Sequence, residues 1–138
     1  MIEAGGCHCG AVRYQIEAEP VFIAVCHCTD CRRNSGAISV GWISVPAKGL
    51  SVLQGQTAAY ASSPGVDRHF CPACGTGLFY YNEEFLPGLV DIQLTTLDNA
   101  AAIEPQMHLQ VADCLPWEKG LNSLPRFERY PEALVHYH

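Results

Sequence analysis

The stretch Cys71-Pro72-Ala73-Cys74-Gly75 contains two cysteines separated by two residues and followed by a glycine. In such a CxxC turn, backbone N–H groups point at the metal-bound sulfurs, and the turn commonly forms half of a four-cysteine zinc site. The glycine lets the backbone bend past the metal without a Cβ clash. The stretch therefore predicts a metal site that organises the fold and needs two more thiolates from elsewhere.

Two other cysteine clusters could supply these thiolates. Cys7 and Cys9 form a CxC pair, whose sulfurs point to the same face of an extended strand. They are the natural donors if their strand lies beside the CxxC turn. The run Cys26-His27-Cys28-Thr29-Asp30-Cys31 contains both spacings and can surround one ion with three sulfurs. Spacing alone leaves open which clusters share an ion.

Seven of the eight cysteines lie in these clusters, so a four-cysteine site leaves three thiolates for a second ion. A closed four-cysteine zinc holds a fold, whereas a zinc with three protein ligands and an open position can do chemistry. The fourth position could instead be closed by His27, Asp30 or His69. The eighth cysteine, Cys114, stands alone, and we expect a buried or idle thiol there.

Composition bounds the class of protein. The chain has 138 residues, of which 49% are hydrophobic, as expected for one globular domain over residues 1–138. No apolar run could span a membrane, and no secretory signal is visible, so we expect a cytoplasmic protein with reduced thiols. The formal net charge is −6, and seven thiolates holding two zinc dications would lower it to −9. A nucleic-acid partner is therefore disfavoured.

The hydrophobic pattern indicates an all-β domain with little helix. Short strands are predicted at residues 11–17, 21–25, 37–45, 50–53, 58–61, 68–70, 78–81, 89–95 and 107–111, separated by Gly, Pro and Ser turns. One helical turn is predicted near residues 30–35 and another within residues 115–124. From Pro105 onward, we expect a coil that wraps the body.

Three motifs, taken together, resemble those of the glutathione-dependent formaldehyde-activating enzymes, a family that shares its domain with centromere protein V. The motifs are GCHCGAVRY at residues 6–14, CHCTDCRR at residues 26–33 and FCPACGT at residues 70–76. The tail, with Trp117 and the segment LPRFE at residues 124–128, is also similar, so the resemblance covers nearly the whole chain.

The resemblance implies a fold and two metal sites. The fold is a β-tent, in which small antiparallel sheets enclose the metals. A structural zinc would be held by Cys7, Cys9, Cys71 and Cys74. A catalytic-type zinc with an open position would be held by Cys26, Cys28 and Cys31.

The resemblance also implies an activity. Members are described as carbon–sulfur lyases that act on S-(hydroxymethyl)glutathione, releasing or forming formaldehyde and glutathione, which is the co-substrate. The partner would then be a small-molecule thiol or thiol adduct, with no nucleic acid and no membrane. The alternative is a non-catalytic zinc-binding module for a protein partner or for metal handling, in which a protein side chain closes the three-cysteine site.

Several residues near the three-cysteine cluster are candidates for the chemistry. His27 and His69, with Asp30 as a weaker candidate, could take the hydroxyl proton as the C–S bond breaks. A histidine between two ligands is more often a supporting or surface residue. Arg32 and Arg33 could offset the charge of the site or bind a glutathione carboxylate, and a solvated face is an equal alternative.

Other ring side chains have plainer interpretations. Trp42, Tyr80 and Tyr81 could line a pocket, but core packing is favoured for aromatic residues on strands. Packing is also favoured for His108. The histidines at positions 136 and 138 are expected to lie in a frayed end.

Overall fold

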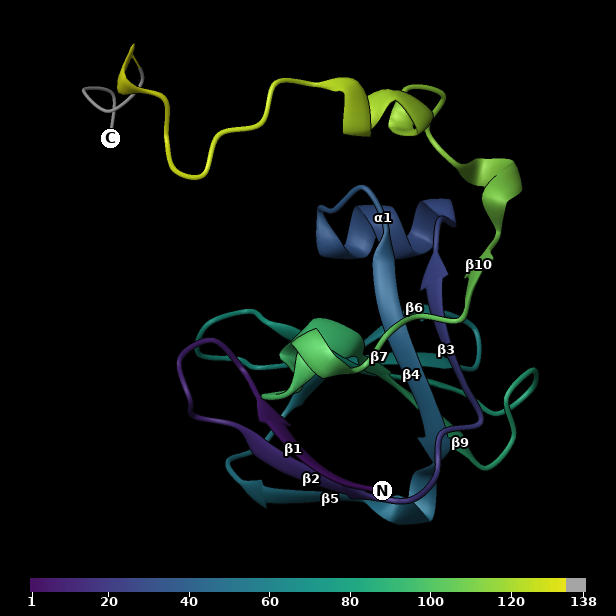
Figure 1. Ribbon diagram of the computed structural model, residues 1–138. Helices are drawn as coiled ribbons and strands as arrows, with labels where there is room; N and C mark the ends of the chain where they lie inside the picture. The colour runs from purple at the N-terminus through teal and green to yellow at the C-terminus, as the bar shows by residue number, and fades with distance from the viewer. Residues whose placement is uncertain (134–138) are drawn as a thin grey trace.

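Two β-sheets form the body of the molecule in the computed structural model, which describes residues 1–133 (Figure 1). The smaller sheet is antiparallel, with the order β1-β2-β5. Its strands are Ile2–Gly6, Arg13–Glu17 and Leu50–Gln54. The larger sheet has the order β10-β3-β4-β9-β8-β7-β6. Its strands in chain order are β3 Phe22–Cys26, β4 Val40–Pro46, β6 Ala58–Ser63, β7 Val66–Phe70, β8 Gly77–Asn82, β9 Leu89–Gln93 and β10 Met107–Leu109.

Helical structure is sparse in the described part of the chain, and the prediction of an all-β fold is confirmed. The α-helix α1 spans Thr29–Ser35. Cys28 is its N-cap residue, and Gly36, with a left-handed φ of 63°, is its C-cap residue. Short 3-10 turns lie at η1 Ala47–Gly49, η2 Leu94–Thr96, η3 Ala100–Ala102, η4 Val111–Asp113 and η5 Glu118–Ser123. None of these helices has the length and apolar character needed to cross a membrane.

The main core lies between the two sheets because alternate residues of their strands point inward. On β2, Tyr14 and Ile16 are fully buried and pack in one cluster with Ile43 of β4 and Ile92 of β9. The Tyr14 ring meets the Phe79 ring edge-on, with centroids 5.2 Å apart. Burial of these side chains supplies most of the driving force that holds the sheets together.

A glycine explains how the first strand fits against this core. A Cβ atom at Gly5 would lie 2.3 Å from the Tyr14 hydroxyl oxygen, so only glycine allows the close approach. The strand Ile2–Gly6 was not predicted, since it ends in two glycines and shows little hydrophobic alternation. Its pairing with β2 places the segment that follows it, including Cys7, beside the core.

The last strand and the tail depart from expectation. β10 pairs with β3 in parallel, with Leu109 opposite Cys26, although every other strand pair is antiparallel in the described residues. Figure 1 shows the chain leaving β10, passing α1 and running away from the sheets. Leu124 and Phe127 are 57% and 62% exposed. The predicted coil wrapping the body is therefore wrong for this segment. The histidines at 136 and 138 lie outside the described residues.

Candidate metal centre

Four sulfurs from two distant parts of the chain meet in one cluster. Cys7 and Cys9 follow β1, whereas Cys71 and Cys74 lie in the turn between β7 and β8. The four Sγ atoms lie within 4.8 Å of one another. The structure thus brings together the cysteines that the resemblance assigns to the structural zinc, in a spacing compatible with tetrahedral coordination.

Hydrogen-bond donors around the four-cysteine cluster favour thiolates. The N–H group of Val12 donates to Sγ of Cys7 over 3.2 Å. The hydroxyl of Thr76 lies 3.2 Å from Sγ of Cys74, and this hydrogen bond is the main cause that lowers the pKa of the Cys74 thiol to about 5. Gly75 has a φ of 82°, the conformation that bends the chain past the sulfurs. The cluster therefore has the donor set of a structural zinc site, and these contacts favour the thiolate at Cys7 and Cys74.

Three further sulfurs gather within one short segment. Cys26 ends β3, Cys28 precedes α1, and Cys31 lies in the first turn of α1. Their Sγ atoms lie within 4.8 Å of one another, and among residues 1–133 no histidine or carboxylate joins this group. The N–H group of Cys31 donates to Sγ of Cys28 over 3.2 Å, so the helix start holds one sulfur in place. The geometry provides three ligands and no fourth from the described chain.

The three neighbouring thiols shift the pKa values of one another. A hydrogen bond with Cys31 lowers the pKa of the Cys26 thiol, and the same contact is the main cause that raises the pKa of Cys31. Opposite shifts of this kind show that the sulfurs share protons, because neighbouring thiolates repel each other. A dication among them would displace the protons from all three. The cluster therefore fits zinc.

A cavity of about 640 Å³ opens beside the three-cysteine cluster. Its wall includes all three sulfur-bearing residues and, opposite them, aromatic and polar side chains of the large sheet. The lining residues include Asp30 of α1 and, from the large sheet, Trp42, Arg68, Tyr80 and Asp91. Trp42 and Tyr80 pack with their ring centroids 5.8 Å apart, so the predicted packing role and the pocket-lining role coincide.

Arg68 is the cation nearest the three sulfurs, and the sequence reasoning did not select it. It lies on β7, is only 6% exposed, and places both Nη atoms 3.8 Å from Sγ of Cys31. Its guanidinium carbon lies 4.8 Å from the centroid of the Tyr80 ring. No carboxylate of the described residues forms an ion pair with it. Its buried charge therefore faces the sulfurs.

Asp91 is a second polar residue of the cavity that the sequence reasoning did not select. It lies on β9 opposite Tyr80 of β8 and is 7% exposed. Burial raises the pKa of its carboxyl group to about 6. Its Oδ1 atom makes no hydrogen bond with the described residues. A carboxyl group that titrates near neutrality therefore faces the same cavity as the sulfurs.

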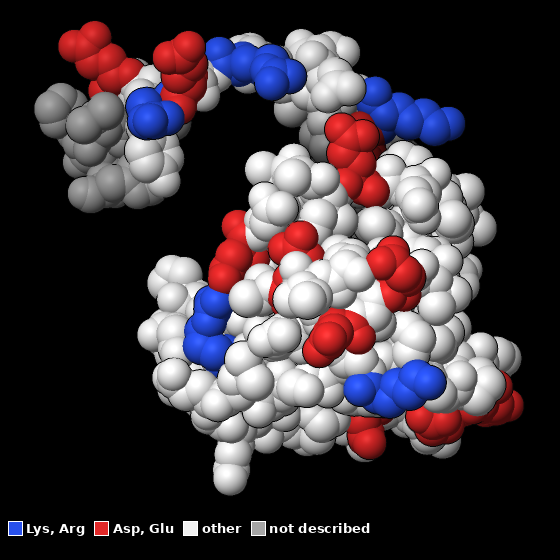
Figure 2. Space-filling view, turned by 60° about the horizontal axis from the view of Figure 1, so that its bottom comes forward, with Lys and Arg blue, Asp and Glu red and all other residues white. Residues whose placement is uncertain are grey.

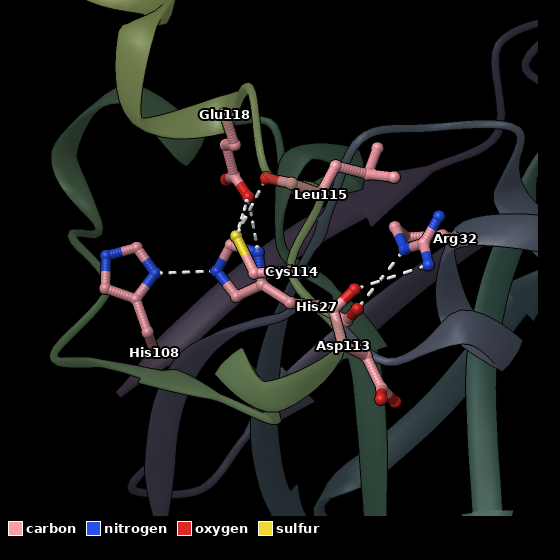
Figure 3. Close-up of polar contacts among 7 residues, drawn as sticks. All are labelled: His27, Arg32, His108, Asp113, Cys114, Leu115 and Glu118. Atoms are coloured by element: carbon pink, nitrogen blue, oxygen red, sulfur yellow. Dashed lines mark hydrogen bonds and ion pairs between the residues drawn. The ribbon is translucent and has the colours of Figure 1, made fainter.

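His27 points away from the cavity, as the middle residue of a CxC pair on an extended segment should. Its ring is 2% exposed, and Nε2 lies 2.8 Å from Nδ1 of His108 (Figure 3). Its Nδ1 atom lies 3.0 Å from Oε2 of Glu118 in the tail. Arg32 lies beside it, donating through Nε to the His27 carbonyl oxygen and through Nη2 to that of Asp113.

The other predicted site residues lie at different places. Asp30 is exposed and lines the cavity. His69 lies in a separate cavity of about 230 Å³, where Thr57 Oγ1 is 2.8 Å from its Nδ1 and burial lowers its pKa. Arg33 is exposed on α1. Of the predicted acid–base residues, only Asp30 shares the cavity with the three sulfurs.

The charged side chains show no concentration of basic groups on the face drawn in Figure 2. Lys and Arg side chains of the described residues are dispersed there, several of them beside Asp and Glu. Tight binding of a nucleic-acid backbone needs several clustered basic groups. This face therefore offers no such surface.

Comparison with known proteins identifies the family. Residues 2–113 match the family described as glutathione-dependent formaldehyde-activating enzyme. A Halomonas elongata protein named "Putative glutathione-dependent formaldehyde-activating enzyme" is 29% identical over 128 residues, covering 85% of this chain and 80% of its own. An uncharacterized lyase of Schizosaccharomyces pombe is 31% identical over 83 residues, covering 55% of each chain.

A solved structure has the same fold. The crystal structure of a Rhodobacter sphaeroides protein superposes with a TM-score of 0.62 at 23% identity, covering 75% of this chain and 98% of that one. The family match spans both cysteine clusters and the strands that carry them. The chain belongs to the family of glutathione-dependent formaldehyde-activating enzymes.

Proposed function

We propose that the protein is a zinc-dependent carbon–sulfur lyase that acts on a thiol adduct, S-(hydroxymethyl)glutathione or a related adduct of glutathione and an aldehyde. One observation carries the proposal: three sulfurs without a fourth protein ligand form part of the wall of a 640 Å³ cavity. The family match and the lyase name of one relative support the reaction class. Glutathione is reduced in the cytoplasm, where we expect the protein to work.

The two clusters would hold two zinc ions with different roles. Cys7, Cys9, Cys71 and Cys74 would hold a structural ion. Cys26, Cys28 and Cys31 would hold the second ion, whose remaining position faces the cavity. When bound there, zinc supplies a soft Lewis acid that stabilises a sulfur atom as a thiolate. A non-catalytic module would need a protein ligand in that position, and no such ligand is present in the described chain.

Arg68 would balance the charge of the second cluster. Three thiolates and one dication carry a net charge of −1, which is costly to bury without a partner. The guanidinium group, 3.8 Å from Sγ of Cys31 and held against Tyr80, supplies the opposite charge. The same charge would favour a thiolate over a thiol on a substrate sulfur in the cavity.

Asp91 would accept the proton that the reaction releases. Cleavage of RS–CH₂–OH breaks the C–S bond, leaves the electron pair on sulfur as RS⁻, and forms the C=O bond as the hydroxyl proton departs. A base with a pKa near the working pH transfers this proton most efficiently. Asp91 has a pKa of about 6 and lines the cavity. Asp30 is the alternative acceptor there, whereas His27 and His69 could act only through intervening residues.

The exposed guanidinium group of Arg33 would be suited to a carboxylate of the glutathione moiety. It lies on α1 two residues after Cys31, beside a shallow pocket that Asp30 and Tyr60 also line. Arg32 is less suited, because it already donates to two backbone carbonyl groups.

Two measurements test the proposed function. Calorimetric titration of the zinc-loaded protein with glutathione should give heat that disappears in Cys28→Ser. Release of formaldehyde from S-(hydroxymethyl)glutathione should exceed the uncatalysed rate for the wild type and not for Cys28→Ser. Absence of heat with glutathione and with its formaldehyde adduct, together with no acceleration, would reject this substrate class.

A further inference from the structure

A third group of potential metal ligands lies outside both cysteine clusters. It consists of His27 Nδ1, Cys114 Sγ and Glu118 Oε2, which lie within 4.8 Å of one another (Figure 3). His27 comes from the loop between β3 and α1, whereas the other two come from the tail. Cys114 and Glu118 also lie beyond residues 2–113, the part of the chain that matches the family. Two of its three members therefore lie outside the matched region.

The histidine of this group is positioned as metal-binding histidines are. Its ring is 2% exposed, and Nε2 lies 2.8 Å from Nδ1 of His108. A hydrogen bond at one ring nitrogen fixes the orientation of a metal-binding imidazole and leaves the other nitrogen free to coordinate. That other nitrogen, Nδ1, is buried and makes no hydrogen bond among the described residues.

The atoms around Nδ1 call for a cation. Oε2 of Glu118 lies 3.0 Å from Nδ1 and 2.6 Å from Sγ of Cys114. When Nε2 of the neutral ring carries the proton toward His108, Nδ1 presents a lone pair to a carboxylate oxygen. Two acceptors that face each other in this way need a proton or a metal ion between them. Nitrogen, sulfur and carboxylate oxygen together form a donor set that zinc prefers.

The backbone on both sides of this group is already fixed. Arg32 donates to the His27 carbonyl oxygen over 3.3 Å and to the Asp113 carbonyl oxygen over 3.3 Å. A single guanidinium group therefore ties the loop that carries His27 to the residue that precedes Cys114 (Figure 3). Ligands held in this way lose little conformational freedom when a metal binds.

We propose that His27, Cys114 and Glu118 form a third site for zinc, which clamps the tail to the loop between Cys26 and Cys28. Binding would replace the thiol proton of Cys114 with the metal, so one proton leaves as the dication enters. Sγ and Oε2 would then separate to the spacing of two ligands of one ion, with water in the fourth position. The site would hold the segment around η5 against the body, where few apolar contacts hold it otherwise.

Zinc stoichiometry tests this proposal without any use of glutathione or of lyase activity. The wild type, loaded with zinc and freed of excess, should carry one more zinc per chain than Cys114→Ala and than Glu118→Ala. Both substitutions leave all seven clustered cysteines in place. The control Glu128→Ala removes another carboxylate of the tail and should retain the wild-type zinc content. Equal zinc content in the wild type and Cys114→Ala would overturn the proposal.

A second measurement tests whether zinc holds the tail against the loop that carries His27. Hydrogen exchange of residues 114–123 should slow when zinc is added to the wild type, and it should not respond to zinc in Cys114→Ala. In cobalt-substituted protein, the difference spectrum between these two chains should contain a sulfur-to-cobalt charge-transfer band. Zinc-independent exchange of this segment in the wild type would contradict the clamp, even if the lyase function is established.

Discussion

The four-cysteine and three-cysteine clusters use the same CxC and CxxC spacings but connect the chain very differently. The first joins residues 7–9 to residues 71–74, whereas the second lies entirely within residues 26–31. A metal that closes a long loop opposes the entropy of the unfolded chain, and a metal held by one short segment does so far less. The long-range cluster should therefore hold the fold, and the local cluster is left available for chemistry.

Replacement of Cys71 by Ser should have the largest effect. It removes a ligand that is fully buried in the main core and ties the CxxC turn to the segment after β1. We expect the unfolding free energy to fall by about 5 kcal/mol or more, or the chain not to fold. Chemical denaturation followed by circular dichroism measures this. Equal destabilisation by Cys28→Ser would remove the distinction between the clusters.

Replacement of Cys28 by Ser should instead abolish function while the fold persists. The substitution breaks the three-sulfur set, and we expect formaldehyde release to fall by at least about 100-fold, as when a group acting directly in the transition state is lost. The circular dichroism spectrum should match that of the wild type, and the zinc content should fall by one. Activity close to that of the wild type would place the chemistry elsewhere.

Replacement of Arg68 by Met should weaken the three-cysteine site and spare the four-cysteine site. Loss of the guanidinium group that contacts Cys31 leaves an uncompensated buried charge when zinc is bound. We expect zinc affinity at this site to fall by about 10- to 100-fold, measured by chelator competition. Arg68→Lys, which keeps the charge but not the paired N–H groups, should lose less. Equal weakening at both zinc sites would indicate a general effect on folding.

Replacement of Asp91 by Asn should have the smallest effect on stability, visible as a change in the pH dependence of the unfolding free energy. Burial raises the pKa of this carboxyl group from 3.8 to about 6, so the native state binds more protons than the unfolded state between these values. The wild type therefore loses stability as pH rises through this range, by about 1.4 kcal/mol between pH 5 and pH 8, whereas Asn loses none from this group. Denaturation of both zinc-loaded proteins at the two pH values measures the difference. Parallel curves would refute the shifted pKa.

The sequence predicted the clusters well because cysteine spacing is a local signal. It predicted the strands that alternate, such as β2, and missed β1, where glycines hide the pattern. Arg68 was missed because its inward position becomes apparent only when it is seen to share a buried face of β7 with Val66. An arginine at an inward position of a strand was the available signal.

Other features depend on contacts between segments far apart in the chain. The parallel pairing of β10 with β3 cannot be read from three residues, and it is this pairing that brings His108 to His27. The contact of Glu118 with the same ring likewise joins segments with no shared motif. Cys114, expected to be idle, has its pKa raised by a hydrogen bond with Glu118, four residues further along the tail.

Strand β7 connects the two cysteine clusters. Arg68 contacts Cys31 of one cluster, and the same strand continues into Cys71 of the other. An ion that fixes the end of β7 would also fix the guanidinium group that favours the second ion. By thermodynamic linkage the coupling is reciprocal, so each ion should raise the affinity for the other by the same factor. The two cysteine clusters should accordingly take up their ions cooperatively, and partial depletion should leave both clusters filled or both empty more often than one filled.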